Sequence, residues 1–197
     1  MDQVNDATAR PLRKDATRNR DLLLDAAQKL FTAHGVDYPL EDVAREAGVG
    51  IGTLYRHFPT RGALIEAVYR REVAALCDSV DGLLAARPPV DALDAWMHNF
   101  VSYVATKRGL SAALQDMMTA EPDLFTETRQ NIRRAATRVL DAAVADGSIR
   151  PVLDADDLTR AMGSICMSAD DPEHPDRAVR LVSVLLDGLR TRPLDAH

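Results

Sequence analysis

A short stretch of the chain, between Leu40 and Arg61, gathers side chains that could hydrogen-bond to nucleic acid. Positions without a bulky side chain let a backbone approach a partner closely, whereas hydroxyl groups and cations reach phosphate oxygens and the edges of bases. Both kinds of position occur together here, so the pattern indicates contact with double-stranded DNA. The positions concerned are Ile51, Gly52, Thr53, Tyr55, Arg56 and His57.

Two short helices must present these positions, because apolar residues recur on the other face of the same stretch. Val49, Leu54 and Phe58 supply that apolar underside. Gly48 separates the two helices, and a glycine can adopt the positive φ that a sharp turn demands. Two helices joined by a tight turn predict a helix-turn-helix over about residues 40–59, whose second helix enters the major groove.

The rest of the chain is also helical in its pattern. Apolar residues recur at helical spacing along nearly all of the 197 residues, and the alternation typical of strands is absent. Apolar residues make up 46% of the chain and aromatic residues only 5%, and this composition, rich in Ala and Leu, favours helix over strand. We expect an all-α protein of about nine helices, three of them in an N-terminal DNA-binding domain followed by a larger C-terminal domain.

Helix breakers and charge predict the domain organisation. Residues 1–16 are expected to form a flexible basic arm, 17–62 the helix-turn-helix domain with a first helix over about 17–33, and 63–197 the C-terminal domain. The net charge is −6, but residues 1–62 hold nine Lys or Arg and nine Asp or Glu, so the acidic excess is C-terminal. The acidity of the whole chain therefore does not argue against DNA binding at its N-terminus.

The DNA-contacting stretch resembles the N-terminal signature of the TetR family of repressors. The pattern AxxAGVxxGTLYxHFxxR runs from Ala44 to Arg61, and close resemblance covers about Arg18 to Val73, with the wider signature extending to about residue 75. Two departures are minor: Tyr38-Pro39 stands where many members place Ser or Thr before the second helix, and Arg61 replaces the common Lys.

The resemblance implies a role for each exposed position. Thr53 and Tyr55 would make backbone and base contacts, while Ile51 and Gly52 would approach base edges. The tyrosine ring has an alternative role in packing against the first helix. Phosphate contacts would come from His57 and Arg61, with Arg45 and either Arg18 or Arg20, at the start of the first helix, as further candidates. Arg56 is interpreted as a solvated charge instead. The full set assigned to DNA is Arg18, Arg45, Ile51, Gly52, Thr53, Tyr55, His57 and Arg61.

The family architecture also implies that the C-terminal domain encloses a ligand cavity and forms a dimer through its last two helices. Five of the six methionines fall in this domain, among them Met97, Met117, Met118 and Met162, and flexible thioethers accommodate varied apolar groups, so we expect an apolar or amphipathic effector. Each candidate could instead be an ordinary core residue. The ligand-binding candidates are Trp96, Phe100, Tyr103, Met117, Met118, Phe125, Met162 and Cys166. The dimer candidates, some of which must face their own core, are Leu158, Ile165, Val179, Val182, Leu186 and Leu189.

The expected partners are therefore a palindromic operator, a small-molecule effector and a second copy of the chain, without a cofactor or metal. Cys77 and Cys166 form no ligand cluster or disulfide framework, which favours a reducing cytoplasm. We find no apolar leader and no stretch approaching the roughly 18 apolar residues of a membrane span, so we expect a cytoplasmic protein without membrane association. The acidic segment 170–176 is interpreted as a solvated loop rather than a cation site.

Two other classes of protein fit the sequence less well. An enzyme would need a nucleophile with a base, paired carboxylates or metal-ligand spacing, and the sequence offers none of these arrangements. An architectural DNA-binding protein without an effector would bind with little sequence preference and a steep salt dependence. The size of the C-terminal domain argues against this architectural alternative, because the domain is larger than dimerisation alone requires.

Overall fold

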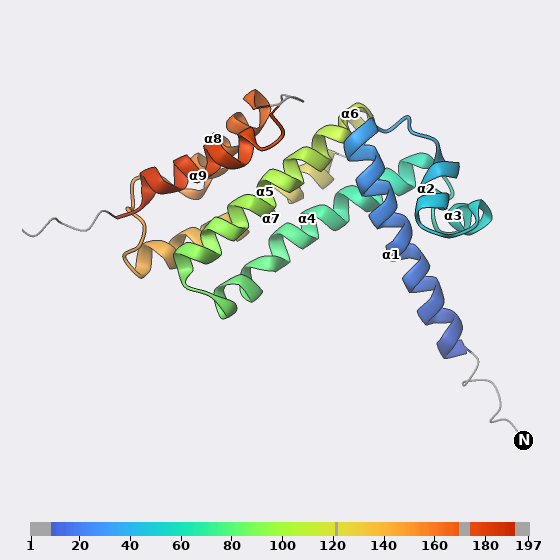
Figure 1. Ribbon diagram of the computed structural model, residues 1–197, viewed down its shortest axis with the longest axis horizontal. Coiled ribbons are helices and arrows are strands. Elements are labelled where there is room, and N and C mark those ends of the chain that lie inside the picture. The colour runs from blue at the N-terminus through green and yellow to red at the C-terminus, as the bar shows by residue number, and fades with distance from the viewer. Residues whose placement is uncertain (1–8, 121, 170–173, 192–197) are drawn as a thin grey trace, which may run out of the picture. The chain divides into compact units, whose positions relative to one another are not determined.

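The computed structural model describes residues 9–120, 122–169 and 174–191, and within these it contains nine helices and no strand longer than an isolated bridge (Figure 1). The prediction of an all-α fold is confirmed. No helix among the described residues is long and apolar enough to cross a membrane. The helices are α1 (Ala9–His34), α2 (Leu40–Glu46), α3 (Ile51–His57), α4 (Arg61–Ala86), α5 (Pro89–Gly109), α6 (Ser111–Ala120), α7 (Pro122–Ala145), α8 (Ala155–Ser168) and α9 (Arg177–Leu189).

The chain divides into two compact units that do not follow one another in sequence. The first unit extends as far as Arg71 and also includes Thr106–Met117, and the second holds Glu72–Ala105 and the chain from Met118 onwards. The first unit is therefore larger than the domain expected over residues 17–62. The reason is that α4 continues without a glycine or proline between Ala63 and Gly82, so no breaker marks the change of unit inside it.

The first helix begins earlier than its sequence pattern predicts. Residues 9–16 belong to α1, although they were expected to lie in the flexible arm, and residues 1–8 of that arm are outside the described part of the chain. Pro11 lies in the first helical turn, where its missing N–H removes no helical hydrogen bond. At the other end, Gly35 terminates the helix with a φ of +83° and donates its backbone N–H to the carbonyl of Phe31, at 2.9 Å.

The core of the first unit is formed where α1 packs on α2 and α3. Leu23, Ala27 and Phe31 are fully buried along one face of α1. The junction between α5 and α6 also approaches this helix very closely. A Cβ atom added to Gly109 would lie 2.4 Å from the backbone oxygen of Phe31 and 2.7 Å from the Cα of Thr32. Only a glycine therefore fits at this crossing.

Polar side chains accompany this close approach. Thr106 is buried in the last turn of α5, and its hydroxyl oxygen lies 3.4 Å from Nε2 of Gln28 and 3.5 Å from Oγ1 of Thr32. These contacts satisfy a hydroxyl group that would be costly to bury alone. They join the end of α5 to α1 within the first unit.

The second unit is built from α7, α8, α9 and parts of α4 and α5, with α8 packed on both α7 and α9. Trp96 is fully buried in it and donates its Nε1–H to the carbonyl of Leu76 at 3.2 Å. Asp154 caps α8 by accepting the backbone N–H of Asp157 at 2.8 Å. A backbone bridge between Ile149 and Arg190 ties the segment before α8 to the end of α9.

Burial raises the pKa of the Cys77 thiol from 9.0 to about 11, with the nearby Asp78 adding to the effect and Arg134 opposing it. At pH 8 the reactive thiolate should therefore be about a hundredfold rarer than in the unfolded chain. We expect Cys77 to react with Ellman's reagent at least about tenfold more slowly in the native protein than in guanidinium chloride. A Cys166→Ala variant leaves Cys77 as the only thiol to be measured, and equal rates in the two states would contradict the prediction.

Candidate nucleic-acid interface

The turn between α2 and α3 has the geometry that its sequence predicts. Gly48 adopts a φ of +70°, which confirms the expected positive φ, and its backbone N–H donates to the carbonyl of Arg45 at 3.1 Å. Val49 donates to the carbonyl of Ala44 at 3.0 Å, so the chain leaves α2 in a closed, hydrogen-bonded turn. The extended backbone of Gly50 then starts α3. The two helices and their turn form a helix-turn-helix.

The two faces of α3 differ in the way a recognition helix requires. Leu54 is completely buried beneath the helix, whereas Ile51, Gly52 and Tyr55 are exposed on it. The side chain of Tyr55 is 46% exposed, so much of its ring and hydroxyl group is accessible to a partner. Thr53 and His57 are half-buried. The structure thus brings the five α3 positions assigned to DNA onto one short helix, and their contacts with DNA stay a prediction.

Arg61 has a structural task that sequence reasoning did not identify. Its Nη1 donates to the carbonyl oxygen of Tyr38 at 2.8 Å and to that of Val36. These two hydrogen bonds hold the loop that precedes α2, where Pro39 is the N-cap residue and provides no side-chain hydrogen bond. The departure Tyr38-Pro39 and the presence of Arg61 are therefore linked: one guanidinium nitrogen of Arg61, at the start of α4, donates to two carbonyl oxygens of a loop that lacks a capping side chain. A phosphate contact by Arg61 stays a prediction.

The two other cations assigned to phosphate lie on exposed surfaces. Arg18 is exposed on α1, and Arg45 is exposed on α2, where it forms an ion pair with Asp42. On α1, Lys29 forms a 2.6 Å ion pair with Glu46, whose pKa it lowers through a hydrogen bond and its charge. Both pairs are solvent-exposed and contribute little to stability.

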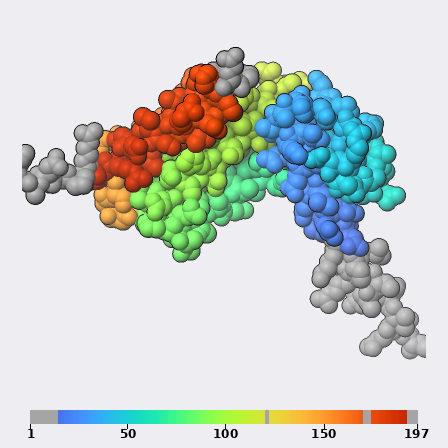
Figure 2. Space-filling view, viewed as in Figure 1, coloured from blue at the N-terminus to red at the C-terminus, as the bar shows by residue number. Residues whose placement is uncertain are grey.

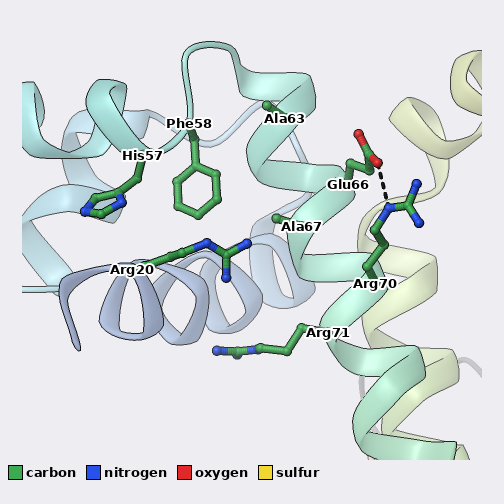
Figure 3. A pocket seen from close by; sticks show the side chains of 8 residues that line it. All are labelled: Arg20, His57, Phe58, Ala63, Glu66, Ala67, Arg70 and Arg71. Carbon is green, nitrogen blue, oxygen red and sulfur yellow. Dashed lines mark hydrogen bonds and ion pairs between the residues drawn. The ribbon is translucent and has the colours of Figure 1, made fainter. Parts of the chain in front are cut away.

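A groove lined by positive charge lies beside the helix-turn-helix, and no local sequence pattern predicts it (Figure 3). Its volume is about 530 Å³. The residues come from three places in the sequence, and only the fold brings them together. The lining residues are Arg20, His57, Phe58, Ala63, Glu66, Ala67, Arg70 and Arg71.

The ligand-binding candidates are divided between the two compact units, and their contact with a ligand stays a prediction. Trp96, Phe100 and Tyr103 form a row of rings in the second unit, with 5.8 Å between successive centroids. Phe125, Met162 and Cys166 are buried in the same unit. Met118 is exposed in that unit, and the half-buried Met117 belongs to the first unit instead. The sequence pattern placed Met117 and Met118 in one cavity, because helical periodicity alone cannot show that a unit ends between these two adjacent residues.

Most of the dimer candidates are buried inside their own subunit. Leu158, Val182, Leu186 and Leu189 are buried in the described chain, and only Ile165 and Val179 are half-buried. The apolar side chains left exposed on α8 and α9 are others, namely Met167, Leu181 and Val184. The expectation that some candidates face their own core is met by the four buried residues. The exposed side chains of Met167, Leu181 and Val184 are better candidates for contact with a second copy of the chain than the four buried residues are.

The described residues contain no group of three or more His, Cys, Asp or Glu placed to hold a metal ion. Residues 170–173 of the acidic segment predicted to be a solvated loop lie outside the described part of the chain.

Comparison with known families covers both parts of the chain. Residues 23–68 match the family described as bacterial regulatory proteins, tetR family. Residues 88–191 match the family described as the C-terminal domain of SbtR-like transcriptional regulators. The helix-turn-helix and most of the second unit therefore each match a regulator family independently.

Two solved structures resemble the chain over most of its length. A TetR transcriptional regulator from Streptomyces coelicolor is 47% identical, with a TM-score of 0.81, and the alignment covers 88% of this chain and 99% of that one. The TetR transcription regulatory protein from Mycobacterium vanbaalenii is 34% identical, with a TM-score of 0.71 and coverage of 92% and 100%.

Among curated relatives, an HTH-type transcriptional regulator from Staphylococcus aureus is 41% identical over 63 residues. That alignment covers 32% of this chain and 34% of the relative. The likeness to this relative is thus confined to about a third of its length.

Proposed function

Because this chain belongs to the TetR family of bacterial transcriptional regulators, we propose that it is a cytoplasmic repressor whose dimer binds a palindromic operator under the control of a small ligand. The family's members are DNA-binding regulators rather than enzymes, which removes the catalytic alternative. The observation that carries the DNA-binding proposal is the exposed face of α3, where Ile51, Gly52 and Tyr55 are accessible above the buried Leu54.

The chemistry of that face suits base reading combined with phosphate contact. Gly52 allows the backbone close to a base edge, Ile51 offers an apolar contact to a thymine methyl group, and Tyr55 offers a hydroxyl group. The turn held by Gly48 fixes the angle between α2 and α3, so these groups are presented by a rigid pair of helices.

Dimerisation is proposed to use the exposed apolar stripe of α8 and α9, defined by Met167, Leu181 and Val184. Leu181 and Val184 are three residues apart and share a face of α9, which lies at the surface of the second unit (Figure 2). A twofold dimer places two recognition helices about 34–36 Å apart, one turn of DNA. A palindromic operator follows from that symmetry.

The effector is proposed to be apolar or amphipathic, because Trp96, Phe100 and Tyr103 gather aromatic surface in the second unit. Signal transfer is proposed to run through α4, which contributes to both units in one unbroken helix. The α5–α6 segment Thr106–Met117 is a second candidate route, since it follows most of α5 in the second unit yet belongs to the first. A ligand changes DNA affinity only if it prefers one of two conformations.

The proposal is tested by selecting bound sequences from random duplex DNA with the purified protein at two salt concentrations. We expect a palindromic site to be enriched and Tyr55→Ala to weaken that site about tenfold to a hundredfold, as expected for losing about 1–3 kcal/mol of contact. Tyr55→Phe should show how much of this loss depends on the hydroxyl group. Binding without sequence preference and with a steep salt dependence would support the architectural alternative instead.

Val152→Ala is the matched control for these variants. Its side chain is 60% exposed in the second unit, outside the helix-turn-helix, so its removal should leave operator binding unchanged. Equal operator affinity of Tyr55→Ala and Val152→Ala would show that this face of α3 does not read DNA.

A further inference from the structure

The C-terminal end of α9 is fastened to the segment that connects α7 to α8 (Figure 1). The backbone N–H of Arg150 donates to the carbonyl of Leu189 at 2.9 Å, and the backbone N–H of Thr191 donates to the carbonyl of Ser148 at 2.8 Å. The side chain of Arg150 adds a third hydrogen bond, from Nη2 to the carbonyl oxygen of Gly188, 38 positions further along the chain. We call these three hydrogen bonds the α9 clip.

The local sequence places Arg150 at this point. Gly147 follows the end of α7 with a φ of +81°, and the backbone N–H of Ile149 donates to the carbonyl of Ala143 at 3.0 Å. Ile149 is 2% exposed, so its side chain anchors the turn in the second unit. Arg150 comes directly after this anchor and is itself exposed. The position of the arginine is therefore fixed by a buried neighbour.

The clip supplies hydrogen bonds that the last turn of α9 lacks. The final carbonyl groups of an α-helix have no partner within the helix, and a cation near them interacts favourably with the helix dipole. Two of these carbonyls, those of Gly188 and Leu189, accept hydrogen bonds from Arg150. At the other end of the helix, Asp176 is the N-cap residue and makes no side-chain hydrogen bond there. A helix of 13 residues is marginally stable alone, so its contacts with the rest of the unit determine where it lies.

The clip ends on the exposed apolar face of α9. Leu181, Val184 and Gly188 follow one another at helical spacing along one side of the helix, and all three are exposed. The opposite side contains Val182 and Leu186, which are buried. One side of α9 therefore packs in its own unit and the other is left for a second copy of the chain, while the clip fixes the end of the helix.

We propose that Arg150 is a positioning residue for dimerisation, which fixes the last turn of α9 so that Leu181 and Val184 meet a second copy of the chain in register. This inference rests on the proposed function, which places the dimer interface on α8 and α9. Arg150 acts through the carbonyl of Gly188. A twofold interface contains every contact twice, so a displaced α9 disturbs the interface at two places.

The experiment compares three substitutions in the full chain. Arg150→Met removes the charge and the side-chain donors but leaves the backbone N–H of the clip, and Arg150→Lys keeps a cation near the same carbonyl. Arg87→Met is the matched control, because Arg87 is an exposed arginine of the same unit outside α8 and α9. Sedimentation velocity over a series of protein concentrations gives the dissociation constant of the dimer. We expect Arg150→Met to raise this constant about tenfold or more, Arg150→Lys less than about threefold and Arg87→Met not at all.

The stability of the subunit is measured separately, in a chain that also carries Val184→Glu and is expected to be monomeric. Urea unfolding of this chain with and without Arg150→Met reports on the clip without any contribution from dimerisation. An arginine with a structural role alone would change the urea midpoint and leave the dimer dissociation constant unchanged, because a subunit that is still folded dimerises as before. In the same monomeric chain we expect Arg150→Met to speed hydrogen exchange in the last turn of α9, and unchanged exchange there would contradict the proposal.

The proposal is overturned when Arg150→Met dimerises as tightly as Arg87→Met, whatever its urea midpoint. It is also overturned when Arg150→Lys dimerises as weakly as Arg150→Met, because a cation at the end of α9 is then not what positions the helix. A Val184→Glu chain that is still dimeric refutes the proposed interface on α9 and this inference with it. A monomeric Val184→Glu chain together with an unchanged Arg150→Met dimer refutes the role of Arg150 alone.

Discussion

Replacing Val184 by glutamate should convert the protein to monomers at micromolar concentration and lower its operator affinity by at least about a hundredfold. The side chain is 65% exposed on α9, so the subunit itself should still fold. In a twofold dimer each contact occurs twice, and a carboxylate buried in an apolar interface without a partner costs about 3–5 kcal/mol. Two separate half-site contacts cannot replace the simultaneous binding of both recognition helices.

Light scattering measures the oligomeric state, and fluorescence anisotropy with labelled operator measures the affinity. Val152→Glu is the matched control, because it places the same charge on another exposed valine of the second unit outside α8 and α9. This control should remain dimeric and bind DNA as the wild type does. A Val184→Glu protein that is still dimeric would show that this stripe of α9 is not the interface.

Replacing Gly109 by alanine should destabilise the protein by about 1–3 kcal/mol or more, because the added methyl group overpacks a close contact. The atoms that it meets, the Phe31 oxygen and the Thr32 Cα, belong to the backbone of α1, so rotation of a side chain cannot relieve the clash. The expected loss of stability is opposite to the usual effect of this substitution, because replacing glycine by alanine inside a helix ordinarily stabilises it by about 1 kcal/mol.

Urea unfolding of Gly109→Ala and Gly82→Ala tests that reversal directly. Gly82 lies in α4, and a Cβ atom added there would meet nothing within 4 Å, so Gly82→Ala should be neutral or stabilising. The two variants differ only in where one methyl group is added. Equal stability of both would mean that α1 and the α5–α6 junction separate easily, and that the close approach has little energetic importance.

The helix-turn-helix could be predicted from sequence because its determinants are local. Gly48, the apolar underside of α3 and the exposed face carrying Tyr55 lie within about a dozen residues, and each has a conformation set by its own type and spacing. The all-α class was equally accessible, because helical periodicity is a property of each segment by itself.

The features that sequence reasoning missed depend on contacts between distant segments. α9 carries two apolar stripes, one through Val182 and Leu186 and one through Leu181 and Val184, and only the packed structure shows which stripe faces the subunit's own core. Spacing cannot distinguish them, because both follow the same helical period. The grip of Arg61 on the loop before α2 joins residues more than 20 positions apart, so it left no local pattern.

The discontinuity of the first unit limits how its parts can be exchanged between proteins. A cut in α4 near Arg71 would separate the helix-turn-helix from Thr106–Met117, which belongs to the same compact body. It would also expose the surface of α1 that receives Gly109 and Thr106. A hybrid protein that joins this DNA-binding unit to the C-terminal domain of another regulator would therefore have to include both the chain up to Arg71 and the segment Thr106–Met117. A hybrid made with a single junction in α4 should fold poorly.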